Sequence, residues 1–315
     1  MPESFFLLTK DHLDIAIDEI VSLAKMHDRF SKITIIDNLV IVQAKTGWEK
    51  ISRRATFVKI SGKVMRKMSG LFLDEENFLL LKNTNTFACR IINLSSDPDD
   101  VNEIEKAMGN MISKFSQAKV SLEDPEIIVY AIFTGKENFF GISKKNTQSI
   151  TPKKIKKHPH ELDRRLTRAM INLIGIETGK TVCDPFCGTG TTLLEAESMG
   201  IRAIGIDFDE KMYQASKANL AINGYQSRLI KGDFSQLAKI IGDVDGIVTD
   251  IPYGRASKTS ENPEDLLGRF VSMLPQKKKI AIMCKKEVGD RAKINPIKKY
   301  EIYRHKSLTR TILIK

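Results

Sequence analysis

The sequence predicts an α/β protein in which a Rossmann-like, mostly parallel, doubly wound sheet in residues 158–315 follows α+β material. Two observations lead to this fold class. From Leu162 onward short apolar runs alternate with helical patterns, which is the order of consecutive βαβ crossovers. In the first 145 residues the apolar runs instead form hairpin-like pairs. Residues 146–157 are polar and basic, which is typical of a linker.

The elements of the front half follow from local patterns. The stretch SFFLLT predicts a strand, DIAIDEIVSLAKMH has apolar residues at helical spacing, and KITIIDNLVIVQA predicts a hairpin around Asp37 and Asn38. A second round contains the strand NTFACRIINL and the amphipathic helix VNEIEKAMGNMISKF. It ends with PEIIVYAIFTGKENFFGIS, a hairpin that turns near Gly135.

The back half alternates helices and strands. The expected order is helix LDRRLTRAMINLIG, strand TVCDPF, helix TTLLEAESM, strand RAIGID, helix EKMYQASKANLAIN, strand SRLIKGD, helix FSQLAKII and strand VDGIVTD. In such a sheet, ligands bind beyond the carboxyl ends of the strands, where the strand order reverses. The residues that follow each strand are therefore the candidates for function.

The basic charge of the chain lies in its second half. Residues 1–150 hold 20 Lys and Arg against 20 Asp and Glu, so the whole net charge of +11 comes from residues 151–315. Basic clusters are often only solvated surface, but several in one chain favour a polyanionic partner such as nucleic acid. The candidate RNA contacts are Arg53, Arg54, Lys59, Lys63, Lys153, Lys154, Lys156 and Lys157.

Composition also excludes some classes of protein. No apolar run approaches the roughly 18 residues of a membrane span, and the N-terminus carries acids where a signal peptide is basic. We expect a cytoplasmic protein with no membrane partner. The four cysteines are few and unevenly placed, so neither a disulfide framework nor a zinc site is expected, and no metal is required.

The turn after the first strand of the back half, DPFCGTGTT, predicts a ligand-binding loop. Gly188 and Gly190 allow the backbone to turn sharply into a helix whose N-terminal amides can hold an anion. A P-loop would need a lysine that is missing, and a dinucleotide fingerprint would need a third small residue where Leu193 stands. A nucleoside ligand with a small anion remains, such as S-adenosylmethionine (SAM) with its methionine carboxylate.

The next two strand ends favour the same ligand. Asp207 lies about 20 residues after the loop, where an acidic side chain can accept from both ribose hydroxyls. Asp233 could accept from the adenine amine, and Phe234 could flank the ring, although each acid alone is more typical of a helix cap. The full set of candidate cofactor-binding residues is Asp184, Phe186, Gly188, Thr189, Gly190, Thr191, Asp207, Phe208, Asp233 and Phe234.

The fourth strand ends in TDIPYG, which has the groups needed to methylate an amine. An exocyclic base amine is a poor nucleophile, and two acceptors, the Asp250 carboxylate and the backbone carbonyl of Ile251, could take its hydrogens. Pro252 fixes the local φ, and Tyr253 can stack on a base that has left its helix. Asp250, Ile251, Pro252 and Tyr253 are therefore the candidate catalytic residues.

These motifs carry a family resemblance. The stretches DPFCGTGT, GIDFD, KGDF and TDIPYG resemble the class I amino-methyltransferases with a D/N-P-P-Y motif, and most closely the archaeal and eukaryotic tRNA guanine-10 N2-methyltransferases. HPHELDRRLTRAMINL and HKSLTR are similar to segments of that family. TFACRI, SLEDPEIIVYAIF and FFGIS resemble a THUMP domain, an RNA-binding module that in this family follows a ferredoxin-like segment.

The resemblance implies a division of the chain and a reaction. It implies a ferredoxin-like segment in residues 1–70, a THUMP-like domain in 71–145, a linker in 146–157 and a SAM-dependent methyltransferase domain in 158–315. The implied reaction is methylation of the N2 amine of guanosine in tRNA, at position 10, once or twice. The family usually has proline where Ile251 stands. A partner subunit occurs among its eukaryotic members, but this sequence does not indicate one.

Three alternatives stay open. The same four-residue motif would suit guanine N2 in ribosomal RNA or adenine N6 in DNA, because these amines present the same two hydrogens. A non-catalytic RNA-binding protein with a methyltransferase-like fold is the third alternative, and it would predict broken ligand residues. Asp184, Asp207, Asp233 and Asp250 all keep suitable chemistry.

Overall fold

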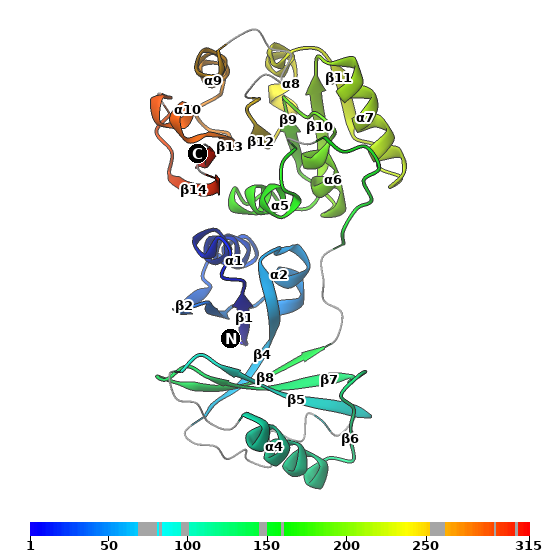
Figure 1. Ribbon diagram of the computed structural model, residues 1–315, viewed down its shortest axis with the longest axis vertical. Helices are drawn as coiled ribbons and strands as arrows, with labels where there is room; N and C mark the ends of the chain where they lie inside the picture. Colours follow the sequence, from blue (N-terminus) through cyan, green and yellow to red (C-terminus); the bar gives the residue numbers. More distant parts are fainter. Residues whose placement is uncertain are drawn as a thin grey trace. The chain divides into compact units, whose positions relative to one another are not determined.

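The computed structural model describes residues 1–68, 81, 84–95, 101–144, 150–158, 161–252, 262–292, 294–305 and 308–315. These residues form two compact units (Figure 1). The first unit comprises Met1–Leu13, His27–Arg53 and Phe57–Gln148, and the second comprises Asp14–Met26, Arg54–Thr56 and Ser149–Lys315. Among the described residues, no helix combines the length and the apolar character that a membrane crossing needs.

The first unit is built on one eight-stranded sheet with the order β2-β3-β1-β4-β8-β7-β5-β6. The strands are β1 (Glu3–Leu8), β2 (Lys32–Ile36), β3 (Leu39–Gln43), β4 (Val58–Met68), β5 (Thr86–Asn93), β6 (Lys119–Val120), β7 (Ile127–Phe133) and β8 (Asn138–Lys144). β5 runs parallel to β6 and β7, and the other pairs are antiparallel. The boundary expected after residue 70 falls within this continuous sheet, since β4 pairs with β8.

The expected hairpins and helix of the front half are confirmed. β2 and β3 turn at Asp37, whose φ of 51° lies in the left-handed region, and β7 and β8 turn at Gly135, with φ 76°. The helix α4 (Val101–Phe115) buries Met108 and Ile112 in the same apolar core as β5 and β7. A short helix, α2 (Trp48–Arg54), precedes β4.

The second unit has a seven-stranded sheet with the order β11-β10-β9-β12-β13-β15-β14. The strands are β9 (Thr181–Asp184), β10 (Arg202–Asp207), β11 (Arg228–Lys231), β12 (Gly246–Asp250), β13 (Lys279–Lys285), β14 (Lys298–His305) and β15 (Leu308–Ile314). The first five are parallel, whereas β15 is antiparallel to β13 and to β14. The Rossmann-like, doubly wound prediction is confirmed, and the strand order reverses between β9 and β12.

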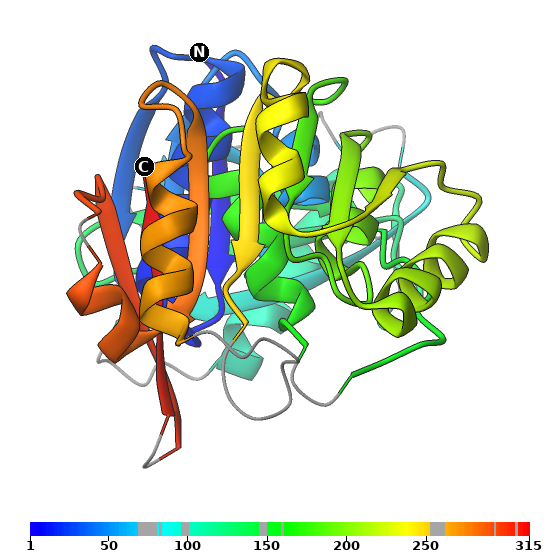
Figure 2. The same ribbon diagram turned by 90° about the horizontal axis from the view of Figure 1, so that it is seen from above.

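Helices accompany this sheet on both sides of the reversal. α6 (Thr191–Ser198) and α7 (Glu210–Ala221) contact β10, and α10 (Lys286–Arg291) contacts β13 and β15. Figure 1 shows α6 beside β10. α9 (Pro263–Ser272) precedes β13. The helix expected at FSQLAKII is instead a 3-10 turn, Phe234–Gln236, followed by the four-residue α8 (Leu237–Ile240). The adjoining ends of β14 and β15 project from the rest of their sheet (Figure 2).

Two helices meet at a buried asparagine in the second unit. Most of α1 (Leu13–His27) belongs to this unit, where Glu19 accepts a 2.8 Å hydrogen bond from Nδ2 of Asn172 on α5 (Arg164–Leu173). Oδ1 of Asn172 accepts from Nε and Nη2 of Arg54, at 3.1 and 2.9 Å. An N-terminal helix is thereby fixed to the back half of the chain by polar contacts.

Candidate active site

The site is built where β9 and β12 end, at the reversal of the strand order. After β9 the chain forms a tight turn in which Gly188 (φ 53°) and Gly190 (φ 84°) have left-handed backbone conformations. Gly190 is also the N-cap of α6, and a Cβ there would lie 2.5 Å from Oγ of the buried Ser216. Glycine is thus required at position 190 both by the backbone and by space.

Asp207, at the end of β10, contacts this turn. Its Oδ2 accepts a 2.8 Å hydrogen bond from the backbone N–H of Gly188, and its Oδ1 accepts one from Asp209 at 2.9 Å. Burial raises the pKa of Asp207, while these backbone hydrogen bonds act against the increase. Each oxygen keeps a second lone pair, so the half-buried carboxylate can still accept from two hydroxyls of a ribose.

Asp184 is buried, although its position at the end of a strand predicts a side chain that contacts the ligand. Only 3% of the residue is exposed, and its Oδ1 accepts from the hydroxyl of Thr249 at 2.6 Å and from the backbone N–H of Phe186 at 3.1 Å. Burial raises its pKa to about 6. These contacts join the ends of β9 and β12, so Asp184 stabilises the turn that follows β9.

The aromatic candidates divide into buried and exposed rings. Phe234 is 4% exposed, and its ring centroid lies 5.3 Å from that of Phe186 and 5.9 Å from that of Phe270. Phe208 directly follows Asp207 and is 42% exposed. Phe208 therefore has the free ring at this edge of the sheet, whereas Phe234 packs in the core. Asp233 is exposed and caps the turn that follows it, accepting from the backbone N–H of Ser235 at 2.9 Å.

Asp250 forms an ion pair with a residue that the sequence patterns did not single out. Nη2 of Arg310, on β15, donates to Oδ1 of Asp250 at the end of β12. The side chains are 4% and 16% exposed, respectively. Burial raises the pKa of Asp250 to about 7, although the Arg310 cation lowers it. The Asp250 carboxyl group is therefore mostly buried, and its pKa is close to neutral pH.

The rest of the catalytic motif is placed in part. The backbone N–H of the buried Ile251 donates to the carbonyl of Met283 at 2.8 Å, which continues the pairing of β12 with β13. Pro252 is half-buried. Tyr253 lies outside the described residues.

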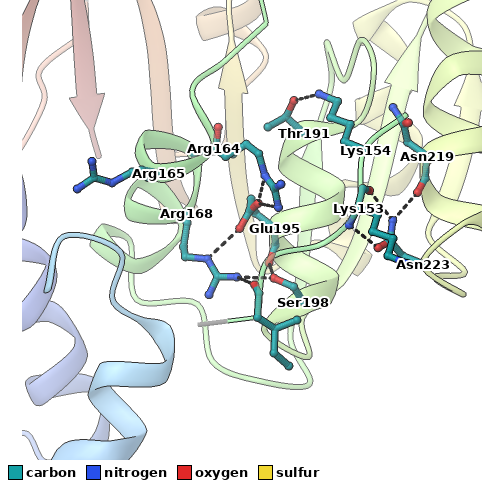
Figure 3. A network of polar contacts seen from close by, with 12 residues as sticks. Lys153, Lys154, Arg164, Arg165, Arg168, Thr191, Glu195, Ser198, Asn219 and Asn223 are labelled. Atoms are coloured by element: carbon teal, nitrogen blue, oxygen red, sulfur yellow. Dashed lines mark hydrogen bonds and ion pairs between the residues drawn. The ribbon is translucent and has the colours of Figure 1, made fainter. Parts of the chain in front are cut away.

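Part of the expected linker is fixed to the second unit (Figure 3). Asn223 exchanges two 2.7 Å hydrogen bonds with the backbone of Lys153, and Asn219 accepts from the N–H groups of Ile155 and Lys156, at 3.0 and 2.8 Å. Nδ2 of Asn219 also donates to the carbonyl of Thr189, at 2.9 Å. One buried asparagine on α7 thus ties residues 155–156 to the glycine turn.

This attachment brings Lys154 to the turn. Its side chain is 3% exposed, and its ammonium donates to Oε2 of Glu161 at 2.6 Å and to Oγ1 of Thr191. The same Glu161 oxygen accepts from Oγ1 of Thr189 at 3.0 Å. Behind the turn Glu195, on α6, forms ion pairs with Arg164 and Arg168 of α5 (Figure 3). The sequence patterns did not indicate Glu161 or Glu195 as candidate site residues.

The candidate RNA contacts also divide by exposure. Arg53, Lys59, Lys63, Lys153, Lys156 and Lys157 are exposed. Arg54 is buried against Asn172, and burial lowers its pKa to about 10. The ammonium of Lys154 is directed into the protein. A phosphate group could reach the first six side chains but neither of the last two.

The chain matches two families of methyl-transferring enzymes and several proteins of known function. Residues 153–305 match the RMKL-like methyltransferase domain family, and residues 57–218 match a DNA methylase family. The tRNA (guanine(10)-N2)-dimethyltransferase of Methanothermobacter thermautotrophicus is 29% identical over 99% of this chain and 98% of its own length. A probable tRNA (guanine(10)-N2)-dimethyltransferase of Methanothermococcus thermolithotrophicus is 31% identical over 47% of this chain and 95% of the relative. This chain belongs to the tRNA guanine-10 N2-methyltransferase family.

Solved structures agree with the fold of the family. The crystal structure of TrmN from Thermus thermophilus superposes with a TM-score of 0.59 at 17% identity and covers 100% of this chain and 99% of its own. SMU.472, solved in complex with SAH, gives a TM-score of 0.53 at 13% identity over 99% of this chain and 97% of its own. As a member of the methyltransferase family this protein is an enzyme, and its cofactor is SAM. The glycine turn and Asp207 have the donors and acceptors that fit this cofactor.

Proposed function

We propose that this enzyme transfers a methyl group from SAM to the exocyclic N2 amine of guanosine 10 in tRNA, once or twice, in the cytoplasm. The observation that carries the proposal is the Asp250 carboxylate at the carboxyl end of β12, paired with Arg310 and adjacent to the glycine turn. Both curated relatives described above are named for this substrate and position, which supports tRNA as the partner.

Residues that follow β10 and β11 would hold the nucleoside of the cofactor. In this proposal the hydroxyls of the ribose donate to Asp207, the adenine amine donates to Asp233, and the exposed ring of Phe208 packs against the base. The sulfonium of SAM supplies a methyl group that is activated for transfer. In this proposal Asp184 supports the turn through its hydrogen bond with Thr249.

Asp250 would prepare the amine for reaction. The nitrogen of an aminopurine is a weak nucleophile because its lone pair is delocalised into the ring. An ionised Asp250 can accept one N–H, and the carbonyl of Ile251 can accept the other, so that electron density returns to nitrogen. The Arg310 cation favours the ionised form of Asp250. We further propose that Tyr253 stacks on the flipped guanine.

Exposed basic residues of both units would contact the RNA. Within the proposed division into a ferredoxin-like segment (1–70), a THUMP-like domain (71–145) and a methyltransferase domain (158–315), phosphate contacts come from exposed basic residues. These are Arg53, Lys59, Lys63, Lys153, Lys156 and Lys157. Arg54 and Lys154 are left out of this set because their charged groups are buried.

Mass spectrometry of nucleosides from a treated tRNA transcript tests the substrate and the position together. N2-methylguanosine or N2,N2-dimethylguanosine should appear after incubation with SAM. Replacing guanosine 10 by adenosine should abolish the product, and Asp250→Asn should lower its rate by about 100-fold or more. Product that persists on the transcript with adenosine 10 would contradict the assignment of position.

A second candidate is methylation of adenine N6 in DNA, because residues 57–218 match a DNA methylase family. Adenine N6 presents the same two hydrogens to Asp250. Duplex DNA and ribosomal RNA included in the same assay separate these possibilities. N6-methyladenine in the DNA, with unmodified tRNA, would favour the second candidate.

A further inference from the structure

The carboxylate of Glu161 is held beside the glycine turn in an asymmetric way. Three donors converge on Oε2, namely the ammonium of Lys154 (2.6 Å), the hydroxyl of Thr189 (3.0 Å) and the backbone N–H of His158 (3.1 Å). Among the described residues, none donates a hydrogen bond to Oε1. The side chain of Glu161 is 23% exposed, so a ligand can reach part of it, and the bonds to Oε2 fix the orientation of the carboxylate.

The charge balance explains why a lysine is buried here. The N-terminus of α6 carries a partial positive charge, and its first N–H groups have no partner within the helix. The Lys154 ammonium, which donates to Thr191 on the first turn of α6, adds a full positive charge. Glu161 compensates that charge. Burial raises the pKa of Glu161, but the hydrogen bonds from Lys154, His158 and Thr189 outweigh this effect and the pKa is lowered.

The result is a cation acceptor next to an anion acceptor. Glu161 presents a negatively charged oxygen, while Lys154 and the N-terminus of α6 favour an anion a short distance away along the turn. An α-amino acid carries both charges on adjacent carbon atoms. SAM ends in this group, and its ribose and adenine have their proposed partners at the ends of β10 and β11.

We propose that Glu161 binds the α-ammonium group of the cofactor's methionine part through Oε1, with Lys154 as the positioning residue that orients Glu161. The carboxylate of the same ligand is bound by the N-terminal amides of α6. This inference rests on the proposed function and adds a residue that selects the amino-acid end of the ligand. Lys154 is thereby assigned to the cofactor site and not to RNA contact.

Calorimetry with two unreactive ligands tests the assignment. SAH carries the whole amino-acid end, whereas 5′-methylthioadenosine carries the nucleoside and sulfur only. Glu161→Gln should weaken SAH binding by at least about tenfold, the usual loss for a charge-assisted hydrogen bond, and leave methylthioadenosine binding unchanged. Lys154→Met should give the same pattern with a smaller loss, because it acts through Glu161.

A third ligand separates the two charges. Decarboxylated SAH keeps the ammonium and lacks the carboxylate, so Glu161→Gln should weaken its binding by about the same factor as for SAH. Glu177→Gln serves as the matched control, since Glu177 is an exposed glutamate of the same unit. This variant should bind all three ligands like the wild type.

The outcomes distinguish this inference from the proposed function. Equal losses for SAH and methylthioadenosine in Glu161→Gln would show a general structural role and overturn the assignment, as would unchanged SAH binding. Wild-type protein that binds none of the ligands would instead contradict the proposed function. Binding to tRNA, measured in parallel, should be the same in Lys154→Met and wild type. A selective loss of tRNA affinity would return Lys154 to the RNA interface.

Discussion

Arg310 reaches across β13 to pair with Asp250, a residue 60 positions earlier in the chain. Asp250 lies opposite Met283 in the pairing of β12 with β13, and Arg310 lies opposite Lys285 in the pairing of β13 with β15. The last strand of the chain, β15, thereby supplies the counter-ion for the proposed catalytic carboxylate. Since Arg310 is 3% exposed, this counter-ion is not screened by bulk water.

The Arg310–Asp250 pair predicts how methyl transfer depends on pH. Asp250 must be ionised to accept an amine hydrogen, and its pKa is raised by burial to about 7, so the rate should increase with pH through about 7. Arg310→Gln removes the cation that lowers this pKa. The increase should then move to higher pH by at least about one unit, and Arg310→Lys should largely prevent the move. Rate measurements from pH 5 to about 10 with saturating substrates check this.

Other charged groups near Asp250 shape the same profile. Asp184, from β9, raises the pKa of Asp250. Asp250 in turn raises the pKa of the Cys284 thiol, from β13. Arg304→Gln is the matched control, because Arg304 is an exposed arginine on β14. If the pH–rate profile of Arg310→Gln keeps its midpoint and only the maximum rate falls, the result would contradict the role of the Arg310 cation. SAH binding reports whether the variant is folded.

The position of Asp207 predicts a selective loss of cofactor affinity. Asp207→Asn should raise the SAH dissociation constant by about 10- to 100-fold, since a charge-assisted hydrogen bond to a ribose hydroxyl contributes about 1.5–3 kcal/mol. Asp209→Asn is the control. Asp209 caps α7 by accepting from the N–H of Lys211, and asparagine caps a helix equally well. Similar losses in both variants, measured by calorimetry, would remove Asp207 from the ribose site.

Two glycines with the same backbone conformation separate space from strain at the turn. Gly190 has φ 84° and Gly179 has φ 83°, but a Cβ would meet Ser216 only at position 190. Gly179→Ala should lower the free energy of unfolding by about 1–2 kcal/mol through strain alone. Gly190→Ala should cost about 1–3 kcal/mol more and weaken SAH binding. Denaturant unfolding and calorimetry give both quantities, and equal stability of the two variants would show that Ser216 yields.

The buried Asn172 predicts a stability effect without a direct effect on chemistry. Asn172→Ala removes hydrogen bonds to Glu19 and Arg54 in a site that excludes water, and should lower the free energy of unfolding by about 3 kcal/mol. Asn295→Ala, at an exposed position, should change it by less than about 0.5 kcal/mol. Thermal unfolding of the two variants measures the difference. A small change at Asn172 would mean that α1 contributes little to the second unit.

Much of the site could be predicted because the information is local. The glycine turn, Asp207 and Asp250 each follow a strand directly, and the carboxyl ends of neighbouring parallel strands meet at one edge of a sheet. The hairpin at Asp37 and the helix α4 were predicted for the same reason, since turn residues and helical periodicity act within a few positions. The alternation of apolar segments was sufficient for the doubly wound sheet.

The remaining features depend on contacts between distant segments. No local pattern indicates that Arg310 meets Asp250, that Lys154 is buried behind a glycine turn, or that Phe234 faces the core while Phe208 stays exposed. A sequence does not show whether an isolated basic or aromatic residue faces solvent or the interior. Local sequence patterns are therefore sufficient to predict the fold class and the order of the strand-end acids. The cations that neutralise these acids become evident only in the folded chain, because burial and Coulomb pairing depend on how the chain packs.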